Sequence, residues 1–150
     1  MFAKIVIIKR PILRGRDIKK YGYEYADLWL INTHNGVKEK GIKPVNINDY
    51  VAVKKHLDLY LPQLGKRQDK GDTFYNLRNC AYIEDFSKQN IVYNDIAQKL
   101  TFCLSEKEMF FNNTIYFIKT KSNIEYLLGI LNSDLIDWCY KTISVQLGEN

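Results

Sequence analysis

The chain has 150 residues, enough for one domain that buries a core without disulfides or a metal. Its composition, 46% hydrophobic and 26% charged, is ordinary for a globular protein and excludes intrinsic disorder. No apolar run reaches the ~18 residues of a membrane span, and the apolar start is too short and too polar at its flanks for a signal peptide. We therefore expect one soluble cytoplasmic domain over residues 1–150.

Positive charge is concentrated in the first half of the chain. Residues 1–80 carry 11 lysines and 5 arginines against 8 acidic residues, whereas residues 81–150 carry 6 lysines, no arginine and 9 acidic residues. The formal net charge of +5 thus combines a half of +8 with a half of −3. Such one-sided charge predicts a surface that faces a polyanion. A basic face that is merely solvated stays open as the alternative.

The first quarter of the chain predicts two strands and a polar region between them. Residues 4–9 form a β-branched run, typical of a buried strand, which Pro11 is expected to end. Residues 14–25 are polar and rich in turn-forming types. Residues 27–33 predict the second strand, and Asn35–Gly36 predicts a tight turn after it.

A helix is predicted over residues 53–64, where leucine and valine recur at a spacing of three to four. Asn48 or Asp49 is expected to cap its start. Pro62 falls inside the pattern and predicts a kink or a break. The loop that follows, residues 65–79, is rich in cations, glycine and aromatic residues.

The second half predicts further strands at residues 91–93 and 114–119, followed by two helices. Ser122 or Asn123 is expected to cap the first helix, and residues 132–134 the second. We expect both apolar stripes in the core; they are Ile124, Leu127, Leu128 and Leu131 in the first helix and Leu135, Ile136 and Trp138 in the second. The pattern predicts a mixed α/β domain.

The cysteines and histidines do not indicate a metal site. Cys80, Cys103 and Cys139 are far apart and form no C-x-x-C pair, which predicts reduced thiols rather than a zinc site or a disulfide framework. His34 and His56 stand alone. We expect each at the surface or in a turn, not as a ligand or a catalyst.

Catalytic motifs are missing from the sequence. Neither G-x-x-x-x-G-K nor G-x-G-x-x-G occurs, and no N-P-P-Y-like loop of an adenine methyltransferase is present. We expect that the chain is not a complete enzyme and neither cleaves nor methylates DNA by itself. A small metal-dependent nuclease that uses Glu84, Asp85 or Glu106 is the alternative from the enzyme class.

Cations and tyrosines coincide in residues 14–25, RGRDIKKYGYEY. Phosphates attract the cations, and bases and sugars suit the aromatic rings, so the stretch predicts a nucleic-acid contact. Two other interpretations stay open. Asp17 can pair with Arg14 or Arg16 as a structural brace, and the tyrosines can form a docking surface for a protein partner.

Six segments in this order resemble the TaqI-like C-terminal specificity domain over nearly the whole chain: PILRGRDIKKY, DLWLINTHNG, INDYVAVKKHLDLYLPQLGKRQDKGDTFYNLRN, NIVYNDI, NNTIYFIK and LLGILNS. This family supplies the target-recognition domains of adenine-specific DNA methyltransferases and of fused type IIG restriction–modification enzymes. The sequence departs from the family pattern at Val51, after Tyr50, where proline is frequent. It departs again at Gln89–Asn90, where proline-lysine is frequent.

The resemblance implies an α+β fold with a twisted, largely antiparallel sheet flanked by helices. It implies sequence-specific binding of double-stranded DNA by a fragment of a longer polypeptide, which carries a methyltransferase domain, in the cytoplasm of a bacterium or archaeon. S-adenosylmethionine, and Mg²⁺ if a nuclease is fused, would serve those other domains; no cofactor is expected in this chain. The residues expected to contact DNA are Arg14, Arg16, Lys19, Lys20, Lys66, Arg67, Lys70, Arg78 and Asn79.

Different roles are expected within this set. Arg14 and Arg16 would point the same way in an extended chain and can read guanine O6 and N7, and Gly15 would let the backbone approach a phosphate. Lys19 and Lys20 are expected to meet phosphates as point charges.

In the second group of these residues, from Lys66 to Asn79, Arg78 and Asn79 are the candidates for base reading. An asparagine amide can pair with adenine N6 and N7, which is the role we predict for Asn79. Arg67 is expected at a helix end, a place that favours a cation in any case.

Overall fold

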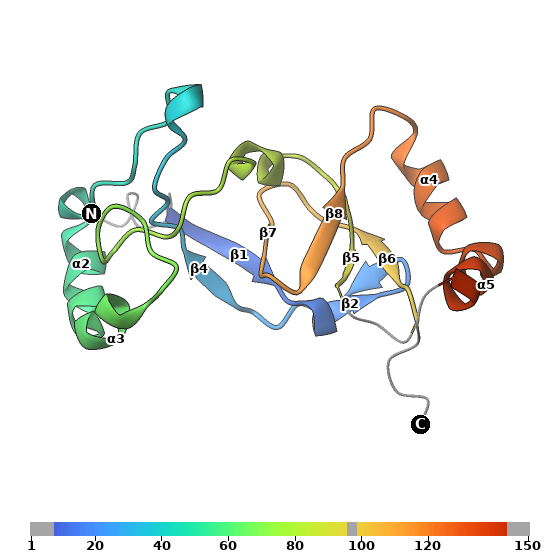
Figure 1. Cartoon of the computed structure of the whole chain (residues 1–150), viewed down its shortest axis with the longest axis horizontal. Helices are drawn as coiled ribbons and strands as arrows, with labels where there is room; N and C mark the ends of the chain where they lie inside the picture. The colour runs from blue at the N-terminus through green and yellow to red at the C-terminus, as the bar shows by residue number, and fades with distance from the viewer. Residues whose placement is uncertain (1–7, 96–98, 144–150) are drawn as a thin grey trace. The chain divides into compact units, whose positions relative to one another are not determined.

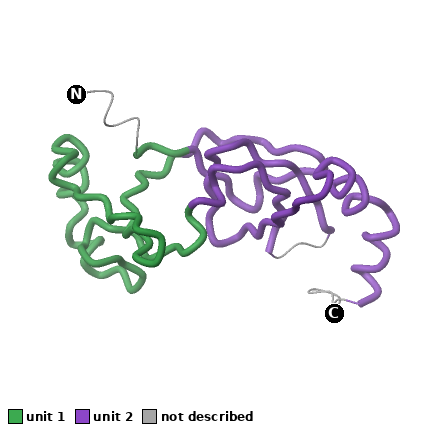
Figure 2. Tube along the Cα trace, turned by 90° about the horizontal axis from the view of Figure 1, so that it is seen from above, with its two compact units in different colours: residues 1–10, 29–83 green, residues 11–28, 84–150 purple. Residues whose placement is uncertain are grey.

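The structure, a computed structural model, describes residues 8–95 and 99–143 (Figure 1). These residues form two compact units (Figure 2). Unit 1 comprises the described residues 8–10 and 29–83, and unit 2 comprises 11–28, 84–95 and 99–143. The chain enters each unit more than once, so each unit combines segments that are distant in sequence. The mixed α+β content confirms the predicted fold class.

Unit 1 joins short strands to a helical segment. Strand β1 (Lys9–Leu13) starts in this unit, beside strand β4 (Trp29–Ile31). The remaining elements are the 3-10 helices η2 (Lys38–Lys40) and η3 (Ile47–Asp49) and the α-helices α2 (Val51–Asp58) and α3 (Leu61–Lys66). Its core consists of Ile8, Ile47 and Val53, against which Ile31, Tyr50, Leu57 and Tyr75 pack.

The first strand differs from its prediction. Pro11 lies inside β1, so the expectation that it ends a strand is wrong. A proline removes only its own N–H from a ladder. The next residue still bonds, since the Ile12 N–H donates to the Leu28 carbonyl at 3.1 Å. Residues 4–7 of the predicted strand lie outside the described part of the chain.

The predicted break at Pro62 is confirmed. Helix α2 ends at Asp58, and α3 begins at Leu61 with Pro62 in its first turn. A proline is tolerated there because the first N–H groups of a helix have no intrahelical partner.

The predicted cap of α2 is wrong. Asn48 and Asp49 lie in η3, and Tyr50 precedes the first residue of α2. Asn46 starts that 3-10 turn earlier, because its side chain accepts the Asn48 N–H at 3.1 Å. The departure at Val51 leaves the helix intact, since α2 begins at that residue.

Unit 2 is built on an antiparallel sheet in which β5 (Ile91–Asn94) lies between β6 (Phe102–Leu104) and β8 (Ile115–Ile118). Ile91 is opposite both Leu104 and Ile118. The other elements are η1 (Gly15–Asp17), the antiparallel pair β2 (Ile18–Lys19) and β3 (Gly22–Tyr23), η4 (Ile83–Ser87), β7 (Phe110–Phe111), α4 (Ile124–Leu131) and α5 (Asp134–Ile143). The end of β1 pairs in parallel with β7.

Side chains from several short strands meet in the core of unit 2. One buried cluster consists of Leu13, Ile18, Val92, Cys103, Met109 and Ile115. A second joins the sheet to α4 through Ile91, Phe102 and Leu128. Burial raises the pKa of the Cys103 thiol to about 12. All three cysteines are free thiols, as predicted.

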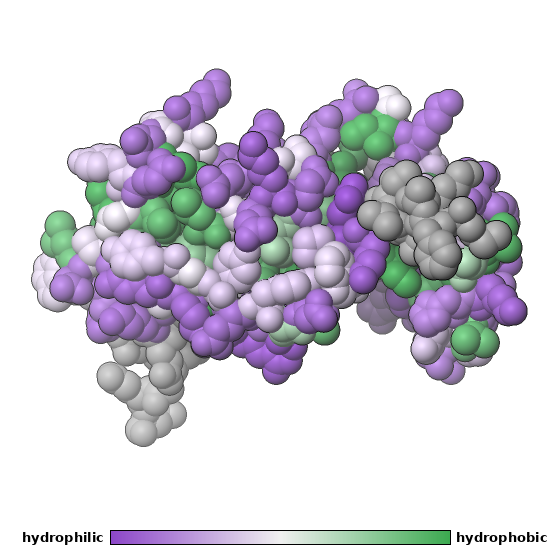
Figure 3. Space-filling view, turned by 180° about the vertical axis from the view of Figure 1, so that it is seen from behind, coloured by the Kyte–Doolittle hydropathy of each residue, from purple (hydrophilic) through white to green (hydrophobic). Residues whose placement is uncertain are grey.

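The predictions for the two helices α4 and α5 are only partly confirmed. Asn123 caps α4, as predicted, by accepting the Tyr126 N–H at 2.7 Å. The expectation of a buried stripe on α5 is wrong, because Leu135 and Trp138 are 66% and 63% exposed. A helical period identifies an apolar face but not what covers it. Figure 3 shows hydrophobic patches among hydrophilic residues on one face of the molecule.

None of the helices in the described ranges is both long and apolar enough to cross a membrane.

Replacing Leu13 by alanine should lower the free energy of unfolding by about 2–5 kcal/mol, because its side chain is fully buried. Leu135→Ala is the matched control and should change it by less than about 0.5 kcal/mol. Urea denaturation followed by circular dichroism measures both. Equal losses in the two variants would show that the α5 face is packed.

Candidate nucleic-acid interface

The residues predicted to contact DNA fall into two groups, one in each unit. Unit 2 holds Arg14, Arg16, Lys19 and Lys20, which we call the β2–β3 surface. Unit 1 holds Lys66, Arg67, Lys70, Arg78 and Asn79, which lie in or next to the loop that we call the 66–79 loop.

Arg14 forms a brace with Asp17. Its Nε and Nη2 donate to the Asp17 carboxylate, the latter at 2.7 Å, and its backbone N–H donates to the same group at 2.9 Å. Asp17 is only 4% exposed, and these hydrogen bonds hold its pKa below the usual range. The interpretation of Asp17 as a structural brace is therefore confirmed, with Arg14 as its partner. Contact of Arg14 with DNA stays a prediction.

The backbone around Gly15 differs from the extended form assumed above, because residues 15–17 form η1. The Gly15 N–H donates to Thr114 Oγ1 at 2.8 Å, and a Cβ on Gly15 would lie 2.8 Å from the Thr114 carbonyl oxygen. The lack of a side chain at Gly15 thus allows close packing against Thr114. The prediction that it allows approach to a phosphate is wrong. Arg16 is exposed and lines a cleft together with Asn94 and Asn112.

Lys19 and Lys20 both reach solvent on the β2–β3 pair. Lys19 Nζ lies 3.6 Å from Glu24, and Lys20 Nζ lies 5.7 Å from the ring centre of Tyr21. Tyr21, at φ 67°, is the turn residue and is 56% exposed. This turn therefore presents cations next to an aromatic ring.

The other two tyrosines of the stretch have internal partners. Tyr23 donates to Glu106 at 3.0 Å, and Tyr25 donates to the Leu28 carbonyl at 2.6 Å. Burial, together with that bond to Glu106, raises the pKa of Tyr23 to about 12. Tyr21 differs from these two in that its exposed ring lies beside a lysine, Lys20.

Of the carboxylates considered for a nuclease, Asp85 pairs with Lys119 at 2.9 Å and Glu106 accepts from Tyr23. Within residues 8–95 and 99–143, no three His, Cys, Asp or Glu side chains gather closely enough to hold a metal ion.

In unit 1, the 66–79 loop is held in part by Asn76, a buried residue that no pattern in the sequence indicated. Asn76, 3% exposed, donates from Nδ2 to the Val45 carbonyl at 3.0 Å and accepts from Thr73 Oγ1 at 2.6 Å. Arg67 donates to the carbonyls of Phe74 and Asn76 at 2.7 and 3.2 Å. Arg67 thus braces the loop from within.

Asn35 ties the far end of the loop to the preceding turn. Its Nδ2 donates to Asp72 Oδ1 at 3.0 Å and to Asn79 Oδ1 at 2.6 Å, while its Oδ1 accepts the Asp72 N–H at 2.9 Å. Gly71 is required here, since a Cβ would lie 2.5 Å from Asn35 Oδ1. The predicted turn is confirmed by the φ of 73° at Gly36. Only the Asn-Gly pair signalled this site in the sequence.

The outer side of the loop presents cations and a ring. Lys70 donates to the Gly65 carbonyl at 3.2 Å and lies 5.2 Å from the ring centre of Phe74, which is 51% exposed. Arg78 lies 3.4 Å from Asp69, and both side chains are largely in solvent. Lys66 is exposed as the last residue of α3.

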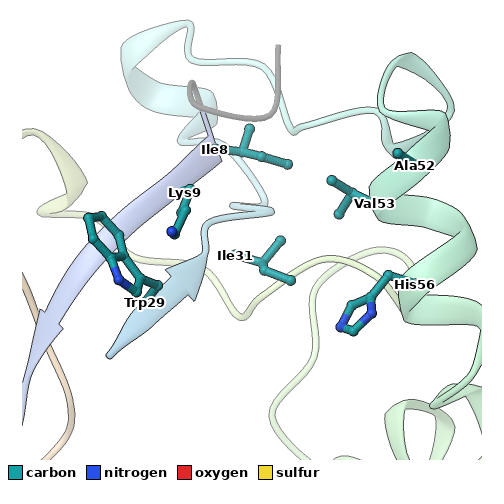
Figure 4. A pocket seen from close by; sticks show the side chains of 7 residues that line it. All are labelled: Ile8, Lys9, Trp29, Ile31, Ala52, Val53 and His56. Carbon is teal, nitrogen blue, oxygen red and sulfur yellow. The ribbon is translucent and has the colours of Figure 1, made fainter. Parts of the chain in front are cut away.

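Unit 1 also has an apolar cleft of about 330 Å³ between the β1–β4 strands and α2 (Figure 4). Ile8, Ile31 and Val53 point into it, and the Lys9 ammonium lies 4.0 Å from the ring centre of Trp29. Base edges are read mainly by hydrogen bonds, whereas, among the described residues that line this cleft, only Lys9 and His56 have polar side-chain groups apart from the Trp29 ring N–H. We therefore do not assign the cleft to base reading.

A family model described as the TaqI-like C-terminal specificity domain matches residues 10–149. Because this match covers nearly the whole chain, the protein belongs to that family. It is accordingly a specificity domain, with a DNA-recognition role in restriction–modification systems. A search of curated proteins finds no significant match.

The surroundings of His34 predict a pH dependence of stability. Its Nδ1 accepts the Gly36 N–H at 3.2 Å, which requires an uncharged Nδ1, and burial lowers the pKa of His34. Below about pH 6.5 the unfolded chain binds the proton first, so the free energy of unfolding should fall by up to about 1.4 kcal/mol per pH unit until the folded pKa is reached.

The control for this prediction is His34→Asn, whose Oδ1 can replace Nδ1 as the acceptor without titrating. Urea denaturation at about pH 7.5 and 5.5, roughly one unit either side of the unperturbed histidine pKa, should show a flatter pH response in the variant. Identical responses would contradict the assigned role of His34.

Proposed function

We propose that this chain is the sequence-specific DNA-binding module of its parent enzyme, and that it contacts duplex DNA through the β2–β3 surface and the 66–79 loop. The observation that carries the proposal is that both groups present exposed cations on hydrogen-bonded frames, within a member of a specificity family. A rigid frame lowers the entropy lost when the side chains bind.

The individual side chains are suited to different parts of DNA, as their exposure and contacts indicate. Lys19, Lys20 and Lys70 carry exposed ammonium groups, which suit phosphates. Arg16 and Arg78 carry guanidinium forks, which suit the O6 and N7 atoms of guanine. Arg14 and Arg67 support the frame through Asp17 and the loop carbonyls, in addition to any DNA contact.

We further propose that the parent is an adenine-specific DNA methyltransferase or a type IIG-like restriction–modification enzyme, acting on DNA in the cytoplasm. Its methyltransferase domain would bind S-adenosylmethionine, and a fused nuclease would require Mg²⁺. Family membership supports this proposal. Isolation of the full-length polypeptide and assay of methyl transfer to adenine test it; a parent without any methyltransferase activity would contradict it.

DNA binding by the chain should depend steeply on salt. If roughly four to six cations meet phosphates, log affinity should fall with log salt at a slope of about −4 to −5. Replacing Lys19 and Lys20 together by alanine should flatten the slope by about one unit per lost contact. Fluorescence anisotropy with a labelled duplex at several salt concentrations measures this slope.

The matched control removes Lys54 and Lys141, which already pair with Asp58 and Asp137 at 3.1 and 2.9 Å. This control loses the same charge and should keep a steeper slope than the Lys19/Lys20 variant. Equal slopes would show that charge in general, rather than the β2–β3 surface, governs binding.

Arg16→Lys and Arg78→Lys separate base reading from charge. Lysine keeps the charge but loses the bidentate fork, so the salt slope should hold while preference for the selected sequence weakens by about 1–3 kcal/mol if the residue reads a base. Selection of bound duplexes from a randomised pool shows the preference. Unchanged preference in both variants would assign base reading to other residues.

A further inference from the structure

The orientation of the Asn79 amide follows from a backbone group. The Asp72 N–H can only donate, so the Asn35 atom that it meets at 2.9 Å must be the carbonyl oxygen Oδ1. The other Asn35 atom is then Nδ2, a donor, and it lies 2.6 Å from Asn79. Asn79 must face it with an acceptor, which is its Oδ1.

The remaining Asn79 group is therefore Nδ2, which carries two donor hydrogens and no acceptor. Asn79 is exposed and lines a cleft of about 300 Å³ together with Asn35 and Asp72. Asn35 is itself buried and has all of its amide hydrogens engaged, so it cannot release the Asn79 oxygen without losing a bond. The amide of Asn79 is thus held in one orientation.

This orientation opposes the role predicted from the sequence. Pairing with adenine needs an amide that donates to N7 and accepts from N6 at once. In Asn79 one lone pair of the oxygen already accepts from the buried Asn35 amide, whereas both Nδ2 hydrogens remain to donate to a ligand. In the major groove, guanine O6 and thymine O4 are acceptors and adenine N6 and cytosine N4 are donors, while N7 of either purine also accepts.

We propose that Asn79 is a specificity-determining residue that donates from Nδ2 to a keto oxygen rather than to a purine N7, so that it selects guanine or thymine over adenine or cytosine at one position of the site. The proposal rests on the proposed DNA-binding function. The group that contacts the base is the Nδ2 donor of Asn79. The buried Asn35 amide is the positioning group that holds this donor in its orientation.

Asn79→Asp tests the proposal because it exchanges the outer donor for an acceptor; the negative charge that it adds is controlled by Gln68→Glu, described below. An aspartate oxygen can still accept from Asn35 Nδ2, while the outer donor becomes an acceptor. The chain is incubated at low salt, about 50 mM, with duplexes that carry a randomised centre, and the bound DNA is sequenced. Wild type should enrich a motif with guanine or thymine at one position, and Asn79→Asp should enrich adenine or cytosine there.

Two further variants serve as controls. Asn79→Ala removes the donor and should abolish the preference at that one position, a change of about 5- to 100-fold. Gln68→Glu adds the same negative charge at an exposed position of the loop and should weaken binding without altering the motif. Circular dichroism and urea denaturation confirm that each variant is folded.

The outcomes separate the two proposals. If wild type enriches a motif that Asn79→Asp and Asn79→Ala both leave unchanged at every position, the proposal for Asn79 is wrong and DNA recognition stands. The same holds if the position that responds has adenine or cytosine in the wild-type motif. If wild type enriches no motif, sequence-specific binding itself is wrong, and the role of Asn79 falls with it.

Discussion

The side-chain amide of Asn35 is the contact on which the basic loop of unit 1 depends. Irregular loops leave backbone donors and acceptors unpaired, and burial of such groups is costly unless a side chain bonds to them. Asn35 pairs with Asp72 and Asn79, while Asn76 bonds three carbonyl groups of unit 1. Unit 2 uses the same device, since both atoms of the Asn132 amide bond the backbone of Phe102 at 2.9 and 3.1 Å. Asparagine amides therefore replace regular secondary structure where the chain must hold a loop in place.

This arrangement separates the cations into two kinds. Arg14 and Arg67 donate to groups of the protein and so help to build the frame, whereas Lys20 and Arg16 extend from it into solvent. A frame that is already ordered loses little conformational freedom when a ligand binds. It also fixes which atom of an amide faces outward, as at Asn79, and fixed donors discriminate between bases better than mobile ones.

Local patterns predicted those features that local chemistry controls. The break before Pro62 follows from the missing N–H of proline, and the cap at Asn123 from the short reach of its side chain to the next turn. The short strands β2, β3, β6 and β7 were not predicted, since two or three residues carry too little pattern to identify a strand. Strand β7 exists because β1, distant in sequence, completes its hydrogen bonds, whereas β2 and β3 pair with each other across a short turn. Local pattern also does not reveal the role of Asn76, because its Nδ2 donates to carbonyl groups that lie 31 and more residues away along the chain.

The sequence by itself determined the mixed α/β class, the concentration of cations in residues 1–80 and the family resemblance, because each depends on residue types and their order alone. Tertiary structure alone decided what each of those residues faces. It turned Arg14 onto Asp17, left Leu135 and Trp138 exposed, and directed the Asn79 oxygen inward. The physical reason is that burial and hydrogen bonding are settled between segments far apart in the chain, where residue spacing carries no information about which atoms will meet.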